Sequence, residues 1–328
     1  MGPTLAEIQT AADSLKGRIV DTPAVGLTSD RITRYLPAGV AATLKLELFQ
    51  QTGSFKARGE LLAIDALSDA EREVGVTGVS AGNHAVALSW AAAAGNVSVK
   101  VVMPEYADPV RIAACRQMGA EVVLTKDIAE AFATVQTIHE SEGRKVLHPF
   151  DSEHMVLGAA TIGLEMAAAR PDAIIIPIGG GGLIAGIASA VKLVSPETLV
   201  FGVEPTGAAA MSASFTAGKP VTIPKVDTIA DSLGAPMALP YSYGIIRENV
   251  DQIVTVSDDE MKRAMVILFD ALKLACEPAC ASSTAALIGP LAETLKGKRV
   301  GLIACGSNIG EVKFAGYLRE GREMLEHT

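Results

Sequence analysis

Aromatic residues and cysteines are both scarce in this chain. Only 4% of its 328 residues are aromatic, and one of them is tryptophan, so the core must be built from aliphatic and alanine side chains. The four cysteines form no CxxC pair and no zinc-ligand spacing, which excludes a disulfide-stabilised scaffold and a structural zinc site. We therefore expect a protein of the reducing cytoplasm that holds no metal.

The chain also has no basic block and no convincing membrane segment. It carries 28 Lys and Arg against 37 Asp and Glu, a net charge of −9, which argues against a nucleic-acid partner. The uncharged run 173–191 is as long as a membrane span, but Pro177 and four consecutive glycines would break a helix in lipid. The first residues show no basic region followed by an apolar stretch, so we expect no signal peptide and no membrane association.

Strand-like and helix-like segments alternate along most of the chain. Two groups of such units, 74–149 and 172–305, predict an α/β fold of two open, twisted parallel sheets with a cleft between them. We divide the chain into a large domain, 1–73 with 150–328, and a small mobile domain, 74–149. The predicted strands span 43–48, which we expect in the large domain, and 75–79, 99–103, 121–124, 145–147, 173–178, 199–203 and 299–304. The predicted helices span 55–67, 83–94, 109–118, 128–142, 183–194, 258–273 and 281–295.

Lys56 stands in the first turn of a predicted helix, directly after the turn formed by Thr52, Gly53 and Ser54. Helix N-termini favour negative charge, so a lysine there is better placed if it loses its charge, for instance in a Schiff base. A desolvated lysine is also a good amine nucleophile. The alternative interpretation is a solvated surface lysine.

The run Ser80, Ala81, Gly82, Asn83 and His84 lies between an apolar strand and an alanine-rich helix. Free backbone N–H groups and small polar side chains at a helix start form an anion site, here of a size that suits a carboxylate. The alternative is an ordinary turn in which Ser80 or Asn83 caps the helix and His84 is a structural histidine.

A run of four glycines, Gly179–Gly182, separates a predicted strand from a predicted helix, as in a phosphate-binding loop. It lacks the GK[ST] ending of a nucleotide P-loop. Gly180, Gly182 and Ala185 also fit a loose dinucleotide fingerprint, with Glu204 after the next strand. A nicotinamide-dependent oxidoreductase is therefore an alternative.

Cys305 and Glu277 complete the candidate site residues. Cys305 follows the last predicted strand, at the edge where α/β sheets bind ligands, although a buried inert thiol is the alternative. Glu277 precedes Pro278 between two predicted helices, where an exposed carboxylate is the alternative.

Taken in order, four motifs resemble those of the fold-type II pyridoxal-phosphate (PLP) enzymes, the tryptophan synthase β-like group: Ser54-Phe55-Lys56, the run 80–84, the tetraglycine loop and Cys305-Gly306-Ser307-Asn308. The chain is most similar to the serine/threonine dehydratase and serine racemase branch, over about residues 5–320. The resemblance implies a homodimer that binds PLP, with Lys56 as the catalytic Schiff-base lysine. It implies cofactor contacts from Phe55, Lys56, Asn83, Gly179, Gly180, Gly181, Gly182, Leu183, Glu277 and Cys305, and substrate contacts from Ser80, Ala81, Gly82, Asn83 and His84.

The implied reaction removes water from a β-hydroxy amino acid and yields a 2-oxo acid and ammonia, with L-threonine or L-serine as the expected substrate. Lys56 would take the α-proton. A neutral Cys305 thiol would not hold the pyridine nitrogen protonated, which favours β-elimination. The alternatives are a 3-hydroxyaspartate dehydratase, a serine racemase-like activity, and a silent amino-acid-binding module on the same fold.

Some positions depart from the pattern of the branch. Ala81 stands where its racemases have a second serine acid/base, which favours one-base elimination over racemisation. Glu204 matches one position of a cation site but Ala210 replaces another, which argues against a metal. The usual Ala-Asp-Gly is 230–232, Ala-Asp-Ser, here. Phe132 lies in the region where some relatives have an arginine for a second carboxylate, which argues against 3-hydroxyaspartate.

Overall fold

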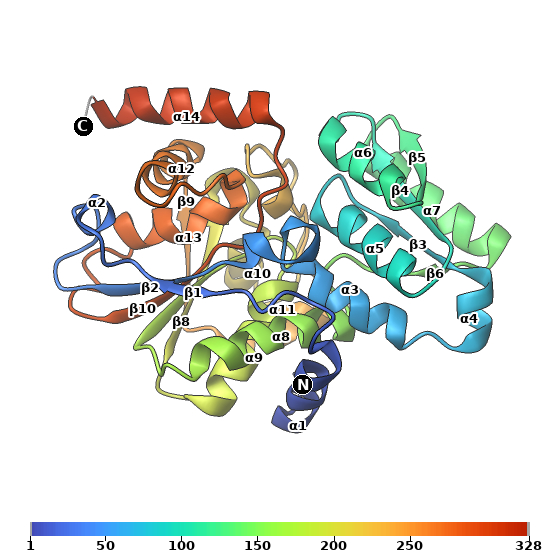
Figure 1. Ribbon diagram of the computed structural model, residues 1–328, viewed down its shortest axis with the longest axis horizontal. Coiled ribbons are helices and arrows are strands. Elements are labelled where there is room, and N and C mark those ends of the chain that lie inside the picture. Colours follow the sequence, from blue (N-terminus) through green and yellow to red (C-terminus); the bar gives the residue numbers. More distant parts are fainter. Residues whose placement is uncertain (1, 327–328) are drawn as a thin grey trace.

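The computed structural model describes residues 2–326 and contains two sheets that lie side by side (Figure 1). The first sheet, the core of what we call the six-stranded unit, has the order β1-β2-β10-β7-β8-β9, with bounds β1 Ala24–Gly26, β2 Ala41–Lys45, β7 Ala173–Pro177, β8 Leu199–Pro205, β9 Gln252–Val256 and β10 Arg299–Ile303. The second, in the four-stranded unit, has the order β5-β4-β3-β6, with bounds β3 Val76–Val79, β4 Val99–Pro104, β5 Glu121–Thr125 and β6 Lys145–Val146. The predicted fold class is confirmed.

Helices cover both sheets. Those packed on the four-stranded sheet are α5 Asn83–Ala94, α6 Pro109–Gln117 and α7 Ile128–Glu142. Those of the six-stranded unit include α1 Leu5–Leu15, α8 Glu153–Ala167, α9 Gly182–Val194, α11 Pro240–Asn249, α12 Asp258–Leu272, α13 Pro278–Ile288 and α14 Glu311–Glu326. Helix α3, Lys56–Asp65, packs against both α8 and α5 and so connects the two units. The short helices are α2 Asp30–Thr33, α4 Asp69–Val74 and α10 Ala210–Ala217.

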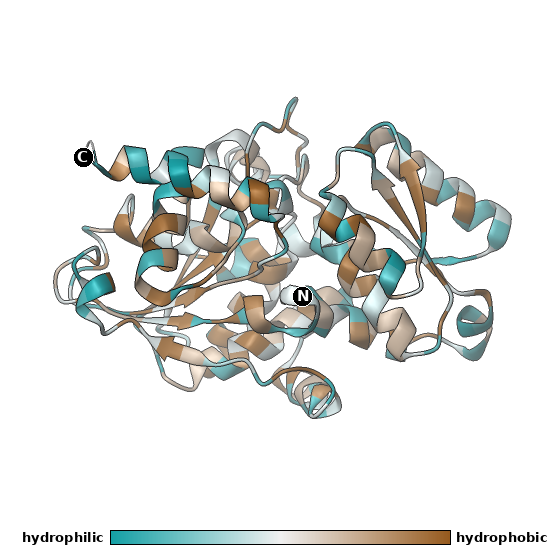
Figure 2. Ribbon diagram, turned by 45° about the horizontal axis from the view of Figure 1, so that its top comes forward, coloured by the Kyte–Doolittle hydropathy of each residue, from teal (hydrophilic) through white to brown (hydrophobic). Residues whose placement is uncertain are grey.

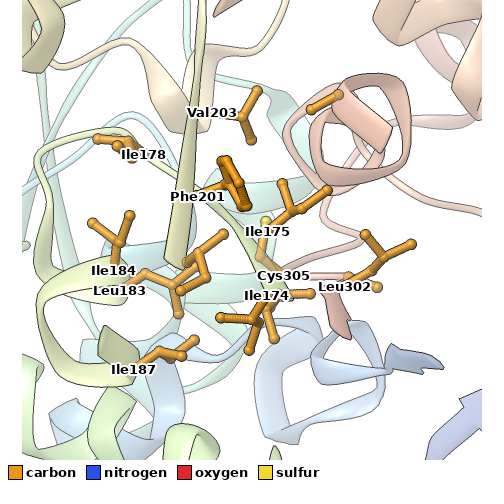
Figure 3. Close-up of a cluster of buried hydrophobic side chains, with 14 of the residues drawn as sticks. Ile174, Ile175, Ile178, Leu183, Ile184, Ile187, Phe201, Val203, Leu302 and Cys305 are labelled. Atoms are coloured by element: carbon orange, nitrogen blue, oxygen red, sulfur yellow. The ribbon is translucent and has the colours of Figure 1, made fainter. Parts of the chain in front are cut away.

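The core of the six-stranded unit is aliphatic, as the composition requires. Every residue of β7 is buried, because β10 and β8 flank it while α9 and α13 pack on it. Figure 3 shows isoleucines of β7 and α9 packed with Phe201 and with Cys305. Hydrophobic residues are concentrated on the strands, whereas the outer helices, such as α14 next to the C-terminus, carry hydrophilic ones (Figure 2).

Two predicted elements have clearly different bounds in the structure. The predicted strand 43–48 ends at Lys45, because Glu47 begins a 3₁₀ turn in which its carboxylate is buried against an arginine. The predicted helix 281–295 is α13, which begins with Pro278 in its first turn and ends at Gly289. Strand β2 does join the large sheet, parallel to β10, whereas β1 pairs antiparallel with β2 at the edge.

Helix α8 is a long element that the sequence pattern did not reveal. It contains Gly158 and Gly163, and glycine lowers the intrinsic preference for helix. Both glycines lie at close helix contacts: a Cβ on Gly158 would stand 2.4 Å from the backbone nitrogen of Gly59 in α3. The pattern also left out α1, α10, α11 and α14 and strands β1 and β9.

Trp90, the only tryptophan, lies on α5 at the side that faces α1 and α3. It packs against the cluster inside the four-stranded unit and also against a second cluster formed by Ala11, Leu15, Leu61 and Leu62. Its indole ring therefore contacts side chains of both units. Within residues 2–326, none of the helices has the length and apolar character that a membrane span requires.

Candidate active site

A pocket lies between the two units, where strands β3, β7 and β10 end. Val79, Pro177 and Cys305, from the carboxyl ends of these strands, line it. The structure brings every residue predicted for the site to this one pocket: Phe55, Lys56, Ser80, Ala81, Gly82, Asn83, His84, Gly179, Gly180, Gly181, Gly182, Leu183, Glu277 and Cys305.

Lys56 is the first residue of α3, and its side chain is partly buried. Its Nζ donates a hydrogen bond to the carbonyl of Pro149 and lies 5.0 Å from the centre of the Phe55 ring. Burial lowers the pKa of Lys56 to about 8, although Glu60 and Cys305 oppose the shift. A lysine with a lowered pKa inside a pocket is a candidate nucleophile and base, not a solvated surface residue.

Behind Lys56, a cluster of buried charges fixes helix α3 to the six-stranded unit. Arg58 donates two hydrogen bonds to the carboxylate of Glu47, at 2.8 and 2.9 Å, and two to Glu165, at 2.6 and 3.2 Å. Arg58 is 1% exposed and Glu47 is fully buried, so this pairing holds the start of α3 in place. We call this cluster the Arg58 network: Thr22, Lys45, Glu47, Arg58, Thr161 and Glu165.

The glycine loop presents the N-terminus of α9 to the pocket. Gly181, the N-cap of α9, has φ = +104°, a conformation that favours glycine. A Cβ on Gly180 would stand 2.1 Å from the ring of Phe150, so no side chain fits between the loop and that ring. The free N–H groups of the first helical turn are suited to bind an anion such as a phosphate.

The run 80–84 forms a second helix N-terminus in the pocket, that of α5. The N-cap is Gly82, which donates its N–H to Ser80 Oγ at 2.9 Å, so neither Ser80 nor Asn83 caps the helix with its side chain. The backbone N–H groups of the first turn of α5 have no partner within the helix and can bind a carboxylate.

The sequence allowed a binding role or a structural role for the His84 ring, and the structure favours the structural role. Its Nδ1 lies 2.5 Å from a carboxylate oxygen of Glu60, and its Nε2 lies 3.1 Å from the carbonyl of Leu147. Both ring nitrogens are thus engaged with protein atoms, and the side chain is 2% exposed. The backbone N–H of His84, in the first turn of α5, is therefore the group that can bind a ligand in the pocket.

Cys305 and Glu277 lie together at the floor of the pocket. Burial is the largest of the effects that raise the pKa of the Cys305 thiol, followed by Cys280 and Glu277, so the thiol stays neutral. Glu277 is 1% exposed, not an exposed helix-end carboxylate. Its Oε1 accepts a hydrogen bond of 2.7 Å from Asn83 Nδ2, and Asn83 Oδ1 accepts another of 2.7 Å from Asn308.

Further residues line the pocket, and Arg111 lies next to it. Ile128 and Phe132, at the start of α7, and Phe150 add apolar surface. Ser232 lies beside Asn83, and Arg111, from the four-stranded unit, binds Asp231 and Glu277. Phe132 and the run 230–232 already stood out in the sequence, whereas Ile128, Phe150 and Arg111 did not.

Glu204 is engaged within the protein. Its carboxylate accepts hydrogen bonds from the backbone N–H groups of Met211 and Ser212, both at 2.8 Å, and from the Ser212 hydroxyl at 2.6 Å. These N–H groups belong to the first turn of α10, so Glu204 supplies the N-terminal acceptor that this helix needs. It is bound to a helix end and not directed at a nucleotide.

The residues of the pocket fit pyridoxal phosphate. The α9 N-terminus, where a Cβ would close the loop, suits the phosphate, and Lys56 supplies the amine. A neutral Cys305 thiol can accept or donate a hydrogen bond at the ring nitrogen. Lys56, the glycine loop and Cys305 would therefore hold the cofactor.

The comparisons with known proteins agree with this fit. The family profile described as "Pyridoxal-phosphate dependent enzyme" matches residues 17–306. A phenylserine dehydratase of Ralstonia pickettii is 53% identical over 86% of this chain and 87% of its own, and the catabolic L-threonine dehydratase of Escherichia coli K12 is 41% identical over 81% and 82%. The structure of threonine deaminase isoform 2 of Solanum lycopersicum has a TM-score of 0.88 at 31% identity and covers 97% of this chain and 94% of its own. The oxidoreductase interpretation of the glycine loop is therefore set aside, and the chain belongs to the pyridoxal-phosphate dependent enzymes of fold type II.

Proposed function

We propose that this protein catalyses the PLP-dependent dehydration and deamination of a β-hydroxy amino acid that carries a small or apolar group on its β-carbon. The substrate loses one water by elimination and takes up one water by hydrolysis, so the products are a 2-oxo acid and ammonia. The observation that carries the proposal is that Lys56, with a pKa of about 8, shares one pocket with two helix N-termini that suit a phosphate and a carboxylate.

We assign the roles of the side chains as follows. When bound, the cofactor supplies an electron sink that makes the α-proton of the substrate acidic. Lys56 Nζ takes that proton as general base, and burial keeps a useful fraction of its amine neutral near pH 8. The α5 N-terminus, with Ser80, Asn83 and the His84 N–H, binds the substrate carboxylate and sets which face of the substrate Lys56 meets.

Further assignments concern the cofactor. Phe55 lies beside the ring, Asn83 at the ring hydroxyl, Gly179–Leu183 at the phosphate and Cys305 at the ring nitrogen. Ala81 offers no acid or base on the face opposite Lys56, which supports one-base elimination over racemisation.

The apolar wall of Ile128 and Phe132 supports a preference for an uncharged β-substituent. Both residues come from α7, and among the described residues that line the pocket the only lysine or arginine is Lys56, which is assigned as the base. Such a wall stabilises a methyl or phenyl group but not a second carboxylate. We therefore propose L-threonine and 3-phenylserine ahead of 3-hydroxyaspartate, and the relative named phenylserine dehydratase supports the phenyl group.

A 2-oxo-acid release assay over L-serine, L-threonine, 3-phenylserine and 3-hydroxyaspartate tests both the proposed reaction and the proposed substrate preference. We expect turnover of threonine and phenylserine, and we expect Phe132→Ala to lower kcat/KM for phenylserine about tenfold while serine changes little, because the lost contact is apolar. Phe132→Leu is the matched control that keeps an apolar wall. No oxo-acid release from any of the four would reject the function, and a preference for 3-hydroxyaspartate would reject the substrate choice.

We also propose that the protein is a homodimer of the reducing cytoplasm and that the four-stranded unit, 74–149, moves as a small domain. The four free, buried cysteines support a reducing compartment. Analytical ultracentrifugation of the loaded protein tests the dimer.

A further inference from the structure

Arg111 lies on α6 of the four-stranded unit, yet most of its hydrogen bonds go to the six-stranded unit. Its guanidinium donates to Asp231 at 2.8 and 3.2 Å, to Glu277 at 3.2 Å and to the Asn308 carbonyl at 2.8 Å. One bond, of 3.3 Å, goes to the carbonyl of Ala81 in its own unit. Arg111 thus joins three segments of the six-stranded unit to the run 80–84 of the four-stranded unit.

The contacts of Arg111 are part of a closed ring of hydrogen bonds beside the pocket. Asn83 Nδ2 donates to Glu277 at 2.7 Å and to Ser232 at 3.3 Å, and Ser232 Oγ donates to Asp231 at 3.4 Å. Asp231 and Glu277 then both accept from Arg111. We call this set the Arg111 network: Asn83, Arg111, Asp231, Ser232, Glu277 and Asn308.

The electrostatics require the arginine at this place. Glu277 is 1% exposed, and burial, its largest influence, raises its pKa, while Arg111 is the strongest effect that opposes the shift. Without Arg111 the carboxyl of Glu277 would be protonated or unpaired, and a protonated carboxyl can donate to Asn83 instead of accepting from it. The side-chain amide of Asn83 would then lose one of the partners that fix its orientation, beside Asn308 and Ser232.

We propose that Arg111 is a positioning residue that closes the four-stranded unit onto the six-stranded unit and, through Glu277 and Asn308, holds Asn83 in the orientation needed at the cofactor. This role rests on the proposed function for its effect on activity, but its effect on closure is a property of the chain alone. The rim contact between Lys313 and Asp108, at 3.7 Å, also joins the two units and lies outside the ring of side-chain hydrogen bonds, although the Asp108 carbonyl accepts the backbone N–H of Arg111 at 2.9 Å.

The test compares four variants by steady-state kinetics and amide hydrogen exchange, the latter on cofactor-free and loaded protein. Arg111→Met removes the charge and five donors, Arg111→Lys keeps the charge but not the forked geometry, and Asp231→Asn weakens one partner that is 43% exposed. Lys313→Ala is the matched control at the rim. We expect Arg111→Met to lower kcat/KM about 10²-fold through misplacement of Asn83, with Arg111→Lys and Asp231→Asn intermediate and Lys313→Ala near the parent.

Hydrogen exchange separates positioning from general stability. In Arg111→Met we expect amides 81–86 and 304–310 to lose protection at least tenfold in cofactor-free and loaded protein, while β4 and β7 exchange as in the parent. If Arg111→Met does not fold, the graded effects of Arg111→Lys and Asp231→Asn carry the test. Parental kcat/KM in these variants, or a loss of protection spread evenly over both sheets, would overturn the proposal. If the parent has no lyase activity but the local loss of protection occurs, the proposed function fails and the closure role stands.

Discussion

Two buried arginines, Arg58 and Arg111, flank the pocket and do different things. Arg58 binds Glu47 and Glu165 inside the six-stranded unit, so every partner moves with it. Arg111 binds Asp231 and Glu277 across the gap between the units, so its pairs exist only when the units are together. The guanidinium of Arg58 thus fixes the helix that carries Lys56. The ion pairs of Arg111, by contrast, require contact between the two units.

The difference follows from which unit supplies the partners and not from their separation along the chain. Arg58 and Glu165 are 107 residues apart but lie in one unit, whereas Arg111 and Glu277 are 166 apart and lie in different units. A buried charge pair between elements that never separate costs desolvation once, at folding. With the movement that we propose between the units, a pair that joins them is desolvated again at each closure, which limits how strongly it can favour the closed state.

The largest expected effect comes from removing the amine that the Arg58 network supports. Lys56→Ala should lower kcat by at least about 10²–10⁴, because the proton acceptor and the attachment point of the cofactor are both lost. The fold should persist, since the amine has a single backbone acceptor, Pro149, within residues 2–326. Circular dichroism checks the fold, the absorbance of lysine-bound cofactor checks the attachment, and oxo-acid release measures turnover. Near-parental deamination by this variant would end the assignment of Lys56.

Arg58→Met sharpens the comparison between the networks. It leaves the fully buried Glu47 with Thr22 and Lys45 as its remaining partners, and breaking such a pair costs about 3–5 kcal/mol of the free energy of unfolding. Arg111→Met should cost less, because Asp231 is 43% exposed and can be hydrated, and the buried Glu277, whose pKa burial raises, can take up a proton. Urea unfolding of the cofactor-free proteins measures both values. Equal losses would show that the two networks do not differ in this way.

Cys305 follows the end of β10 and lies in the pocket near Glu277 of the Arg111 network. Cys305→Ser keeps a neutral donor and acceptor and should retain most activity, whereas Cys305→Ala should cost about 1–3 kcal/mol of cofactor affinity. Cys305→Asp places a charge beside Glu277 and should slow β-elimination. Equilibrium dialysis of the cofactor and oxo-acid release distinguish these outcomes. Unchanged cofactor affinity in all three, with lowered stability, would make the thiol a packing residue only.

The lowered pKa of Lys56 predicts a pH dependence. Because burial favours the neutral amine, the rate at which cofactor-free protein binds PLP covalently should rise about tenfold per pH unit below pH 8 and level off above it. Stopped-flow absorbance across pH 6–10 measures this rate, where the pH range is about two units on either side of the expected midpoint. A midpoint near 10.5, the value of an ordinary lysine, would mean that burial does not act on this amine.

The smallest effect concerns the run 80–84, in which Arg111 contacts the carbonyl of Ala81. Ala81→Ser adds a hydroxyl on the face that we assign opposite Lys56, so a trace of D-serine should form from L-serine. Chiral chromatography measures it, with Ala81→Val as a control of similar bulk without a hydroxyl. A strictly L-product would mean that a hydroxyl alone does not complete a second proton path.

The sequence was sufficient where the chemistry is local. The glycine loop, Lys56 and the run 80–84 each join a strand end or turn to a helix start, so neighbouring residues carry the whole signal. Arg111 was missed because its helix reads as an ordinary surface helix and its partner Asp231 is 120 residues away. Helix α8 was missed because Gly158 weakens the helical pattern for the sake of close packing on α3.

The position of Trp90 gives this chain a built-in optical probe. Because it is the only tryptophan and contacts both units, the emission of the native protein comes from one place beside the joint between them. Rotation of one unit against the other changes what surrounds the indole, and with it the emission wavelength and the access of a dissolved quencher. The movement that we propose for the four-stranded unit can therefore be tested in solution, in real time, on the unlabelled protein.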